Sequence, residues 1–179
     1  MCGIVGYIGA RDATPIIYNG LKRLEYRGYD SAGIAILQNG QIEVRREAGK
    51  LSGLADLLQK SPISGTLGIG HTRWATHGAP SARNAHPHVG QTGRVVVVQN
   101  GIVENFLELR EELSSEGVEF KSDTDTETIV HLVEHYLATG LGLEAAARKT
   151  FQHIRGANVV VLMSADEPER PSSAGTPSN

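Results

Sequence analysis

The chain has 179 residues, of which 40% are hydrophobic, and this is enough for the core of one domain. Its formal net charge is −3 at pH 7 and its lysines and arginines are scattered, so the composition gives no support for nucleic-acid or anionic-membrane binding. The single cysteine excludes an intrachain disulfide, and no apolar run approaches the roughly eighteen residues of a membrane span. No cationic leader precedes the first apolar run, so we expect a cytoplasmic protein.

The N-terminal stretch places the only cysteine, Cys2, directly after the initiator methionine. Methionine before a small second residue is normally trimmed, so the mature chain would begin with a cysteine that carries a free α-amine. The thiolate is a strong nucleophile, and an α-amine titrates near pH 8, about where it can accept and return a proton. The alternative is an ordinary buried cysteine near a frayed end. Residues 3–9 are typical of a strand, with glycines where the backbone approaches a neighbour.

The first half of the chain shows two helical and several extended patterns. Thr14 followed by Pro15 predicts a helix start, and the apolar spacing predicts an end near residues 26–28. Asn39-Gly40 tolerates positive φ, which favours a tight hairpin turn between two strands. We expect the two strands at residues 31–37 and 41–47. A helix over residues 51–58 and another strand over residues 66–72 should follow.

The second half begins with a long polar loop over residues 73–93, and a loop of this length requires a functional reason. A valine run over residues 95–99 predicts a strand that is buried on both faces. Asn105 is expected to cap a helix, and Thr124 with Glu127 matches a capping box that opens another. These two helices should end near residues 113 and 139, and a third helix should end near residue 152. We also expect a strand over residues 159–163 and a disordered tail over residues 166–179.

Two pairs of histidines have spacings that could bind a metal. His131 and His135 match the H-x-x-E-H spacing of one zinc-peptidase class. The apolar stripe of the same helix lies on the other side, so we expect both imidazoles to face solvent. For His86 and His88 we expect hydrogen bonds that brace the long loop. The sequence contains no dinucleotide fingerprint and no phosphate-binding loop, and we predict neither a metal nor a cofactor.

Several segments, taken together, resemble the class II glutamine amidotransferases, which are N-terminal-nucleophile hydrolases. The match runs from about residue 2 to residue 163 and rests on motifs in family order, which lie at residues 2–6, 25–33, 71–78, 84–88, 100–105 and 123–127. Tyr29 and Trp74 resemble the branch that acts on fructose 6-phosphate, whereas the phosphoribosyl-diphosphate branch is the weaker alternative. The resemblance implies an α+β fold, a four-layer αββα sandwich, with an incomplete glutaminase domain over residues 2–165 that is truncated at its C-terminus.

The resemblance also implies roles for individual residues, with glutamine as the substrate. Cys2 would attack the side-chain amide, and the oxyanion would be stabilised by Asn100 and the backbone N–H of Gly101. Arg73 would bind the α-carboxylate and Asp125 the α-ammonium. Trp74, Thr76 and His77 would bind the substrate as part of a lid that closes over glutamine, and Arg27 and His86 would be supporting residues.

Family members continue with further strands and with two sugar-phosphate isomerase domains that bind fructose 6-phosphate, and full-length members are expected to be homo-oligomers. Truncation or a reading-frame change would explain the Pro- and Ser-rich end of this chain. We therefore expect, at most, hydrolysis of glutamine to glutamate and ammonia, without synthesis of glucosamine 6-phosphate. Two alternatives stay open, an inactive fragment of the same enzyme and a metal hydrolase that uses His131 and His135.

Overall fold

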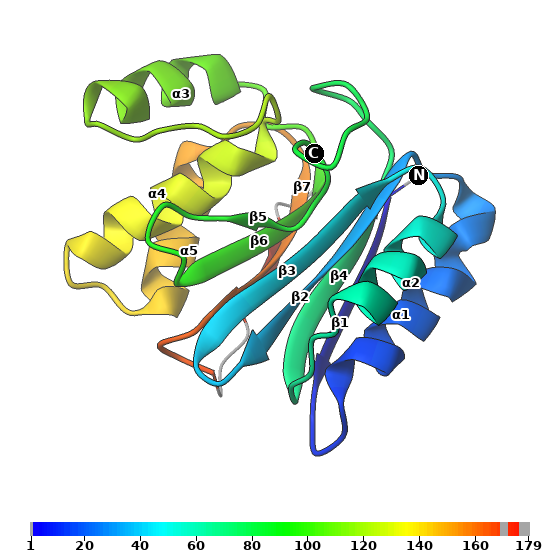
Figure 1. Cartoon of the computed structure of the whole chain (residues 1–179). Helices are drawn as coiled ribbons and strands as arrows, with labels where there is room; N and C mark the ends of the chain where they lie inside the picture. Colours follow the sequence, from blue (N-terminus) through cyan, green and yellow to red (C-terminus); the bar gives the residue numbers. More distant parts are fainter. Residues whose placement is uncertain (1, 169–171, 176–179) are drawn as a thin grey trace.

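The computed structural model describes residues 2–168 and 172–175. Its backbone forms two four-stranded antiparallel sheets that pack face to face, with helices on both outer sides (Figure 1). The first sheet has the order β1 (Gly3–Ile8), β4 (Leu67–Arg73), β2 (Ser31–Gln38) and β3 (Gln41–Ala48). The second has the order β5 (His88–Val89), β6 (Val95–Gly101), β7 (Asn158–Ser164) and β8 (Ser172–Gly175). The four-layer αββα sandwich implied by the resemblance is confirmed.

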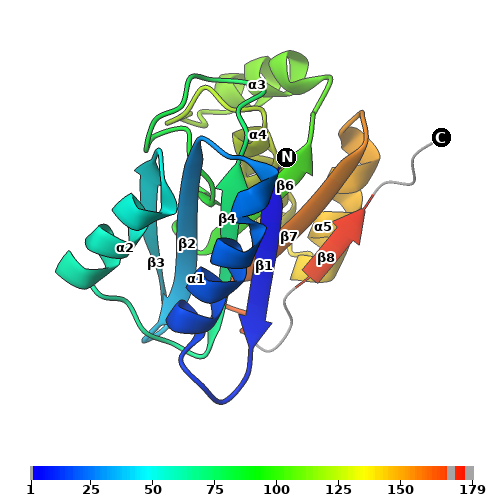
Figure 2. The ribbon, with the colours of Figure 1, turned by 90° about the vertical axis from the view of Figure 1, so that its right-hand side faces the viewer.

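The helices divide between the two sheets. The first sheet is covered by α1 (Ala13–Leu24) and α2 (Leu51–Lys60), as Figure 2 shows, and the short 3-10 helix η1 (Glu25–Arg27) follows α1. The second sheet is covered by α4 (Thr126–Ala138) and α5 (Leu143–His153), and α3 (Phe106–Ser115) packs on α4. Within the described chain, none of these helices has the length and apolarity that crossing a bilayer requires.

Side-chain alternation explains how the central layers pack. In β6, Val96 and Val98 enter the core between the sheets, whereas Val95 and Val97 enter the core under α4. The valine run is therefore buried on both faces, as predicted. In β4, Ile69 faces the other sheet and Gly70 faces α1, where a Cβ on Gly70 would lie only 2.4 Å from Ile17 Cγ2.

The elements of the first half follow the sequence-based predictions closely. The hairpin between β2 and β3 turns at Asn39 and Gly40, whose φ angles are 52° and 75°. The start of α1 differs, because Asp12 is the N-cap and its carboxylate accepts the N–H of Thr14 at 3.1 Å. The hydroxyl of Thr14 instead donates to Ile63 O at 2.8 Å, so the predicted cap at Thr14 is wrong.

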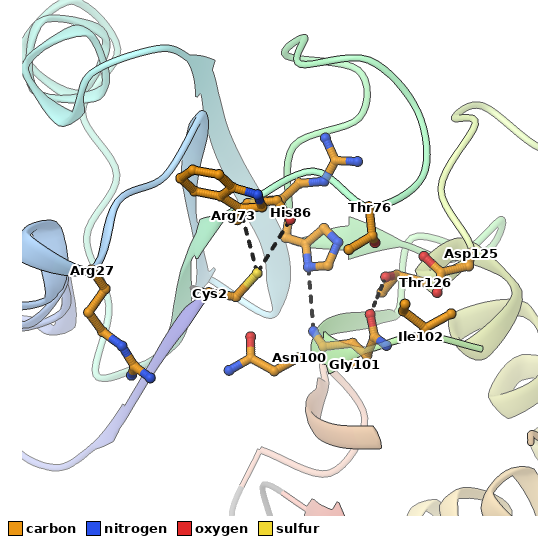
Figure 3. A pocket seen from close by; sticks show the side chains of 12 residues that line it. Cys2, Arg27, Arg73, Thr76, His86, Asn100, Gly101, Ile102, Asp125 and Thr126 are labelled. Carbon is orange, nitrogen blue, oxygen red and sulfur yellow. Dashed lines mark hydrogen bonds between the residues drawn. The ribbon is translucent and has the colours of Figure 1, made fainter. Parts of the chain in front are cut away.

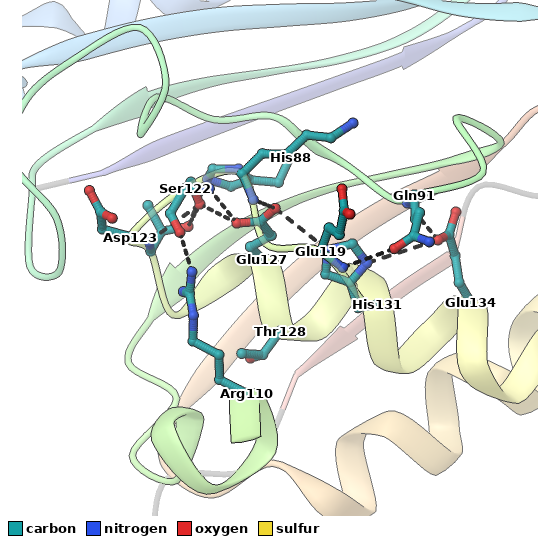
Figure 4. A network of polar contacts seen from close by, with 12 residues as sticks. His88, Gln91, Arg110, Glu119, Ser122, Asp123, Glu127, Thr128, His131 and Glu134 are labelled. Atoms are coloured by element: carbon teal, nitrogen blue, oxygen red, sulfur yellow. Dashed lines mark hydrogen bonds and ion pairs between the residues drawn. The ribbon is translucent and has the colours of Figure 1, made fainter. Parts of the chain in front are cut away.

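In the second half the predicted capping box is wrong, and Asn105 is the N-cap residue of α3 without the capping hydrogen bond, because these side chains have other partners. The Glu127 carboxylate accepts hydrogen bonds from the backbone N–H groups of Lys121 and Ser122, both at 2.7 Å, instead of closing a capping box with Thr124 (Figure 4). The Thr124 hydroxyl pairs with His88 Nε2 at 3.0 Å. Asn105 does precede α3, but its side chain bonds to the backbone of residues 153 and 155 rather than to the helix.

The prediction that His131 faces solvent is wrong, because α4 is covered on both sides. His131 is 3% exposed, its Nε2 lies 3.5 Å from Glu127 Oε1, and its ring packs edge-to-face with that of Phe120. The other side of α4 therefore packs beneath the segment that precedes it. His135 is more exposed and pairs with Glu116 at 2.9 Å. No cluster of three or more His, Cys, Asp or Glu side chains that could hold a metal occurs within residues 2–168 and 172–175.

The tail also differs from its prediction at one point. Residues 172–175 form β8, which pairs antiparallel with β7 in the register Val159↔Gly175 to Leu162↔Ser172. Strand pairing uses backbone groups, so a Ser- and Gly-rich segment can occupy a free sheet edge although it adds little apolar surface. The rest of the predicted tail beyond residue 168 lies outside the described residues.

Candidate active site

The site forms where three strands end at one edge of the sandwich. β1 and β4 are antiparallel neighbours with Gly3 opposite Thr72, so the start of β1 and the end of β4 coincide, which brings Cys2 and Arg73 together. Asn100 and Gly101 end β6 in the other sheet, and Asp125 immediately precedes α4. Figure 3 shows these side chains around one pocket of about 630 Å³. Its lining residues are Cys2, Arg27, Arg73, Trp74, Thr76, His86, Gln99, Asn100, Gly101, Ile102, Asp125 and Thr126.

The Cys2 thiol is held by the backbone of Trp74, the residue that follows β4. Its sulfur accepts the N–H of Trp74 at 3.2 Å and donates to Trp74 O at 3.6 Å. Behind it, a Cβ on Gly3 would lie 2.7 Å from Leu24 Cδ1, so α1 leaves no room for a side chain at that position. The start of β1 is therefore held in place, and the partly exposed sulfur faces the pocket.

Asn100 and Gly101 occupy the end of β6, where each has a distinct constraint. Asn100 Oδ1 lies 2.8 Å from Nε2 of His71, a buried residue of β4. Gly101 has a φ of 137°, and a Cβ at this residue would lie 2.2 Å from Ala157 O. Only glycine fits there, and its backbone can therefore line the pocket directly.

Arg73 is a buried cation with one unused donor. Its Nη2 donates to the backbone carbonyls of His77 and Gly78, the second at 3.0 Å. Its Nη1 is buried, lies 3.9 Å from Asp30 Oδ1, and has no hydrogen-bond partner in the described part of the chain. Burial lowers the pKa of Arg73 from its ordinary value, and the charge of Asp30 opposes this effect. Arg73 is therefore a buried cation in the wall of the pocket, and its Nη1 is the donor that the loop carbonyls do not use.

Asp125 lines the opposite wall. Its Oδ2 accepts the backbone N–H of Val103 at 2.8 Å, and its Oδ1 lies 3.8 Å from His77 Nδ1. His77 packs edge-on against Phe106, with ring centroids 4.8 Å apart, and is absent from the lining residues of the described pocket. His77 therefore lies beside Asp125 but outside the pocket lining, its Nδ1 has no hydrogen-bond partner among the described residues, and the lid contact implied by the resemblance stays a prediction.

The remaining predicted residues lie around the mouth and the floor of the pocket. Trp74 is 56% exposed, and Thr76 follows it in the loop. Arg27 lines the pocket from η1, and the next residue, Gly28, has a φ of 75° and lies against the Trp74 ring. The position of Trp74 thus depends on the η1 segment.

His86 forms part of the floor, and the prediction that it braces the long loop is confirmed. Its Nδ1 accepts the backbone N–H of Gln99 at 3.4 Å, and its ring stacks on that of His71 at 4.3 Å. A Cβ on Gly33 would lie 2.2 Å from the His86 carbonyl oxygen, so the loop packs directly on β2. Burial lowers the pKa of His86 well below its ordinary value, which keeps the ring neutral.

Sequence reasoning missed three lining residues, Gln99, Ile102 and Thr126. The buried Gln99 side chain donates to Asn158 Oδ1 at 2.6 Å and accepts from the Thr126 hydroxyl at 2.6 Å, so it joins β6 to β7 and to α4. Gln99 could have been found from the sequence, because it directly follows a buried valine run and a buried amide needs specific hydrogen-bond partners.

Comparison with known proteins gives the context for this geometry. A family model described as glutamine amidotransferase domain matches residues 71–170. The glutamine–fructose-6-phosphate aminotransferase (isomerizing) of Pyrococcus horikoshii is 54% identical over 170 residues, 95% of this chain and 28% of that protein. The enzymes of the same name from Chlorobaculum tepidum and Thermus thermophilus are 50% and 53% identical, over 95% and 94% of this chain and 28% of each protein.

Solved structures agree on the fold. The glutamine phosphoribosylpyrophosphate amidotransferase of B. subtilis, complexed with ADP and GMP, superposes with a TM-score of 0.78 at 25% identity, over 92% of this chain and 35% of that chain. An allosteric regulatory enzyme of purine biosynthesis gives a TM-score of 0.80 over 92% of this chain and 36% of that chain, also at 25% identity. The chain has the α+β fold of the N-terminal-nucleophile hydrolases. It spans about 28% of the length of the curated relatives that it matches. It belongs to the class II glutamine amidotransferase family.

Proposed function

We propose that this chain hydrolyses glutamine to glutamate and ammonia through a thioester on Cys2, and that its glutaminase domain spans residues 2–165. The observation that carries the proposal is the convergence of a thiol, an amide, a buried guanidinium and a carboxylate on one pocket of about 630 Å³. These groups are Cys2, Asn100, Arg73 and Asp125. Together they match the charges and the reacting atoms of free glutamine.

The first half-reaction breaks the amide bond of the substrate. The α-amine freed by loss of Met1 accepts the proton of the Cys2 thiol, and the thiolate attacks the side-chain carbonyl carbon. The oxyanion that develops would be stabilised by the Asn100 amide N–H and the Gly101 backbone N–H. When the tetrahedral intermediate collapses, the C–N bond breaks, and the stored proton passes to the nitrogen that leaves as ammonia.

The second half-reaction returns the enzyme to its starting state. Water attacks the γ-glutamyl thioester while the α-amine accepts its proton, and the same donors stabilise the second oxyanion. The C–S bond then breaks, the sulfur regains a proton, and glutamate leaves. No redox step or cofactor is needed to balance this sequence.

Substrate recognition follows from the two charges of glutamine. The α-carboxylate would accept hydrogen bonds from Arg73, whose buried Nη1 lacks a hydrogen-bond partner among the residues described. The α-ammonium would pair with Asp125, whose Oδ2 is used by Val103 N and whose Oδ1 is turned to the His77 side. Trp74 and Thr76 at the mouth of the pocket would then reduce the access of water.

The relatives suggest what the ammonia is for. Their name, glutamine–fructose-6-phosphate aminotransferase, describes the transfer of an amino group to fructose 6-phosphate, and we propose that this site supplies ammonia to that reaction when it is joined to the rest of such an enzyme. The identity is 50–54% to these enzymes and 25% to the phosphoribosylpyrophosphate enzyme, which favours the branch that acts on fructose 6-phosphate. Binding of fructose 6-phosphate and homo-oligomer formation stay predictions for the part of the relatives that this chain does not span.

The test is made on the 179-residue chain itself. Intact mass should show loss of Met1, and glutamine should yield equal amounts of glutamate and ammonia, with no glucosamine 6-phosphate when fructose 6-phosphate is added. Cys2→Ala should abolish turnover while the melt stays cooperative. A fully active chain that retains Met1 would contradict the role of the α-amine. A cooperative, glutamine-stabilised fold without turnover would instead indicate an inactive fragment.

A further inference from the structure

One hydrogen bond joins the two sheets at the active-site end of the core between them. In β4, Leu67 and Ile69 face the second sheet, and in β6, Val96 and Val98 face the first. The next residue on each of these faces is polar, His71 in β4 and Asn100 in β6, and their side chains meet with Nε2 2.8 Å from Oδ1. The apolar interface therefore ends in a polar contact between the strands that carry Arg73 and Gly101.

His71 is held rigidly in a neutral state. The residue is 0% exposed, and its ring stacks on His86 at 4.3 Å with an interplanar angle of 22°. Burial lowers its pKa from 6.5 to about 4, against the opposing effect of the hydrogen bond to Asn100. A neutral imidazole has one N–H, so its tautomer decides whether Nε2 donates or accepts.

We infer that His71 is a positioning residue, whose Nε2–H donates to Asn100 Oδ1 and so directs the Asn100 amide nitrogen into the pocket as an oxyanion donor. The inference rests on the proposed function and extends it by one residue to which the sequence motif gave no role. The opposite tautomer would have to accept from the Asn100 amide nitrogen, which would turn Oδ1 into the pocket. A carbonyl-type oxygen there would repel the developing oxyanion.

The chain offers a matched pair of variants for the test. In His71→Gln, the amide nitrogen can occupy about the position of Nε2 and keep the donor, whereas in His71→Asn the shorter side chain cannot reach Asn100. Both replacements are neutral amides, so both remove the ring and its stacking on His86. Any difference between them therefore reports the hydrogen bond.

The two variants should differ in turnover and agree in binding. We expect His71→Asn to lower kcat for glutamine hydrolysis about 10- to 100-fold with KM within about threefold of the parent chain, since the loss of one oxyanion donor costs about 10²- to 10³-fold. His71→Gln should keep kcat within about tenfold of the parent. Alkylation of Cys2 by iodoacetamide forms no oxyanion, so its rate should be similar in all three proteins. Equal kcat values for the two variants, or parallel losses in alkylation, would overturn the inference.

A double-mutant cycle separates positioning from general damage. If His71 acts only through Asn100, the His71→Asn/Asn100→Ala double variant should be no slower than Asn100→Ala alone. Independent, multiplicative losses would mean that His71 acts in another way.

The geometry can also be tested without turnover. The ring nitrogens of His71, observed by ¹⁵N NMR and assigned with His71→Gln, should report a neutral ring protonated on Nε2 from about pH 5 to 8. A proton on Nδ1, or titration near the ordinary pKa, would refute the inference. If the parent chain fails to hydrolyse glutamine, the proposed function is lost, but this measurement still decides the orientation of the hydrogen bond.

Discussion

The two outer halves of the sandwich differ in what they bury. Beneath α1 and α2 the buried residues are almost entirely apolar, and the buried polar residues of the first sheet gather at its active-site edge, at Ser31 and residues 71–73. Around the start of α4 the buried residues include a run of polar side chains, namely Ser122, Thr124, Asp125, Thr126, Glu127, Thr128 and His131. The first half is therefore specified by apolar packing, and the second depends on a polar network.

The difference has a functional reason. A pocket for a doubly charged substrate needs an acidic wall, and Asp125 can supply it only if the chain reverses just before α4 without leaving backbone donors unpaired. Glu127 satisfies two of these donors, at Lys121 and Ser122, and also accepts from the Ser122 hydroxyl at 2.6 Å (Figure 4). The polar network is the means by which the second half holds Asp125 in place.

The largest expected effect is acid sensitivity that arises from two buried histidines, His71 at the active-site edge of the first sheet and His88 beside the polar network. The pKa of His71 is about 4 and that of His88 about 3 in the folded chain, because burial lowers both from 6.5. Between pH 6.5 and 4 the unfolded chain binds more protons, so the free energy of unfolding should fall as the pH falls, by about 3 kcal/mol for His71 alone.

Urea unfolding at several pH values between 7 and 4 measures this effect. Glu127 adds a loss of the same sign at lower pH, because hydrogen bonds from His131 and the 121–122 segment outweigh burial and lower its pKa to about 2. The control is His71→Gln, which should flatten the dependence. A free energy of unfolding that stays constant down to pH 4 would contradict the neutral, buried histidines.

The second effect is the loss of the acceptor that organises the network. Glu127→Gln should destabilise the fold by about 2 to 3 kcal/mol. The two carboxylate oxygens of Glu127 accept hydrogen bonds from the backbone N–H groups of Lys121 and Ser122, and a glutamine amide has only one oxygen that can accept. The matched control is Glu144→Gln, which removes an exposed ion pair with Arg148 and should cost less than about 0.5 kcal/mol. Equal losses in urea unfolding would mean that the network contributes no more than a surface pair.

The same contrast explains what could be predicted from the sequence. In the first half, residues 31–48 and 51–60 were predicted closely, because alternation and helical spacing record which face is buried. At α4, the capping box and the solvent-facing His131 were wrong, because sequence spacing does not reveal that a preceding segment covers the outer side of the helix. Local patterns describe an element, whereas this network depends on contacts between elements.

The site divides in a similar way. Cys2, Arg73, Asn100 and Asp125 belong to motifs and were all expected to meet, and they line one pocket. His71, Gln99 and Thr126 received no role, because their importance lies in the partners they reach across the sheets rather than in the substrate. Residues that act through another residue carry a weaker sequence signal than residues that act on the ligand.

A third effect concerns the substrate rather than the fold. Arg73→Lys should raise KM for glutamine about 10- to 100-fold with a smaller change in kcat, because an ammonium cannot reproduce the planar fork that bonds two loop carbonyls and leaves Nη1 for a carboxylate. Steady-state kinetics on the 179-residue chain test this prediction. The exposed Arg148→Lys is the control and should leave KM within about twofold. An unchanged KM in Arg73→Lys would remove the carboxylate-binding role.

The smallest expected effect tests the apolar half at a site without a polar network. Asn39 has a φ of 52° in the hairpin between β2 and β3, a conformation that costs most residues free energy but that asparagine and glycine adopt readily. Asn39→Ala should therefore lower the free energy of unfolding by about 1 kcal/mol, and Asn39→Gly should change it by less than about half of that. Urea unfolding at pH 7 measures both, and neither variant should alter KM, because the turn is remote from the pocket-lining residues. If alanine and glycine were equivalent, backbone conformation would not govern the turn, and the first half would depend on apolar packing alone.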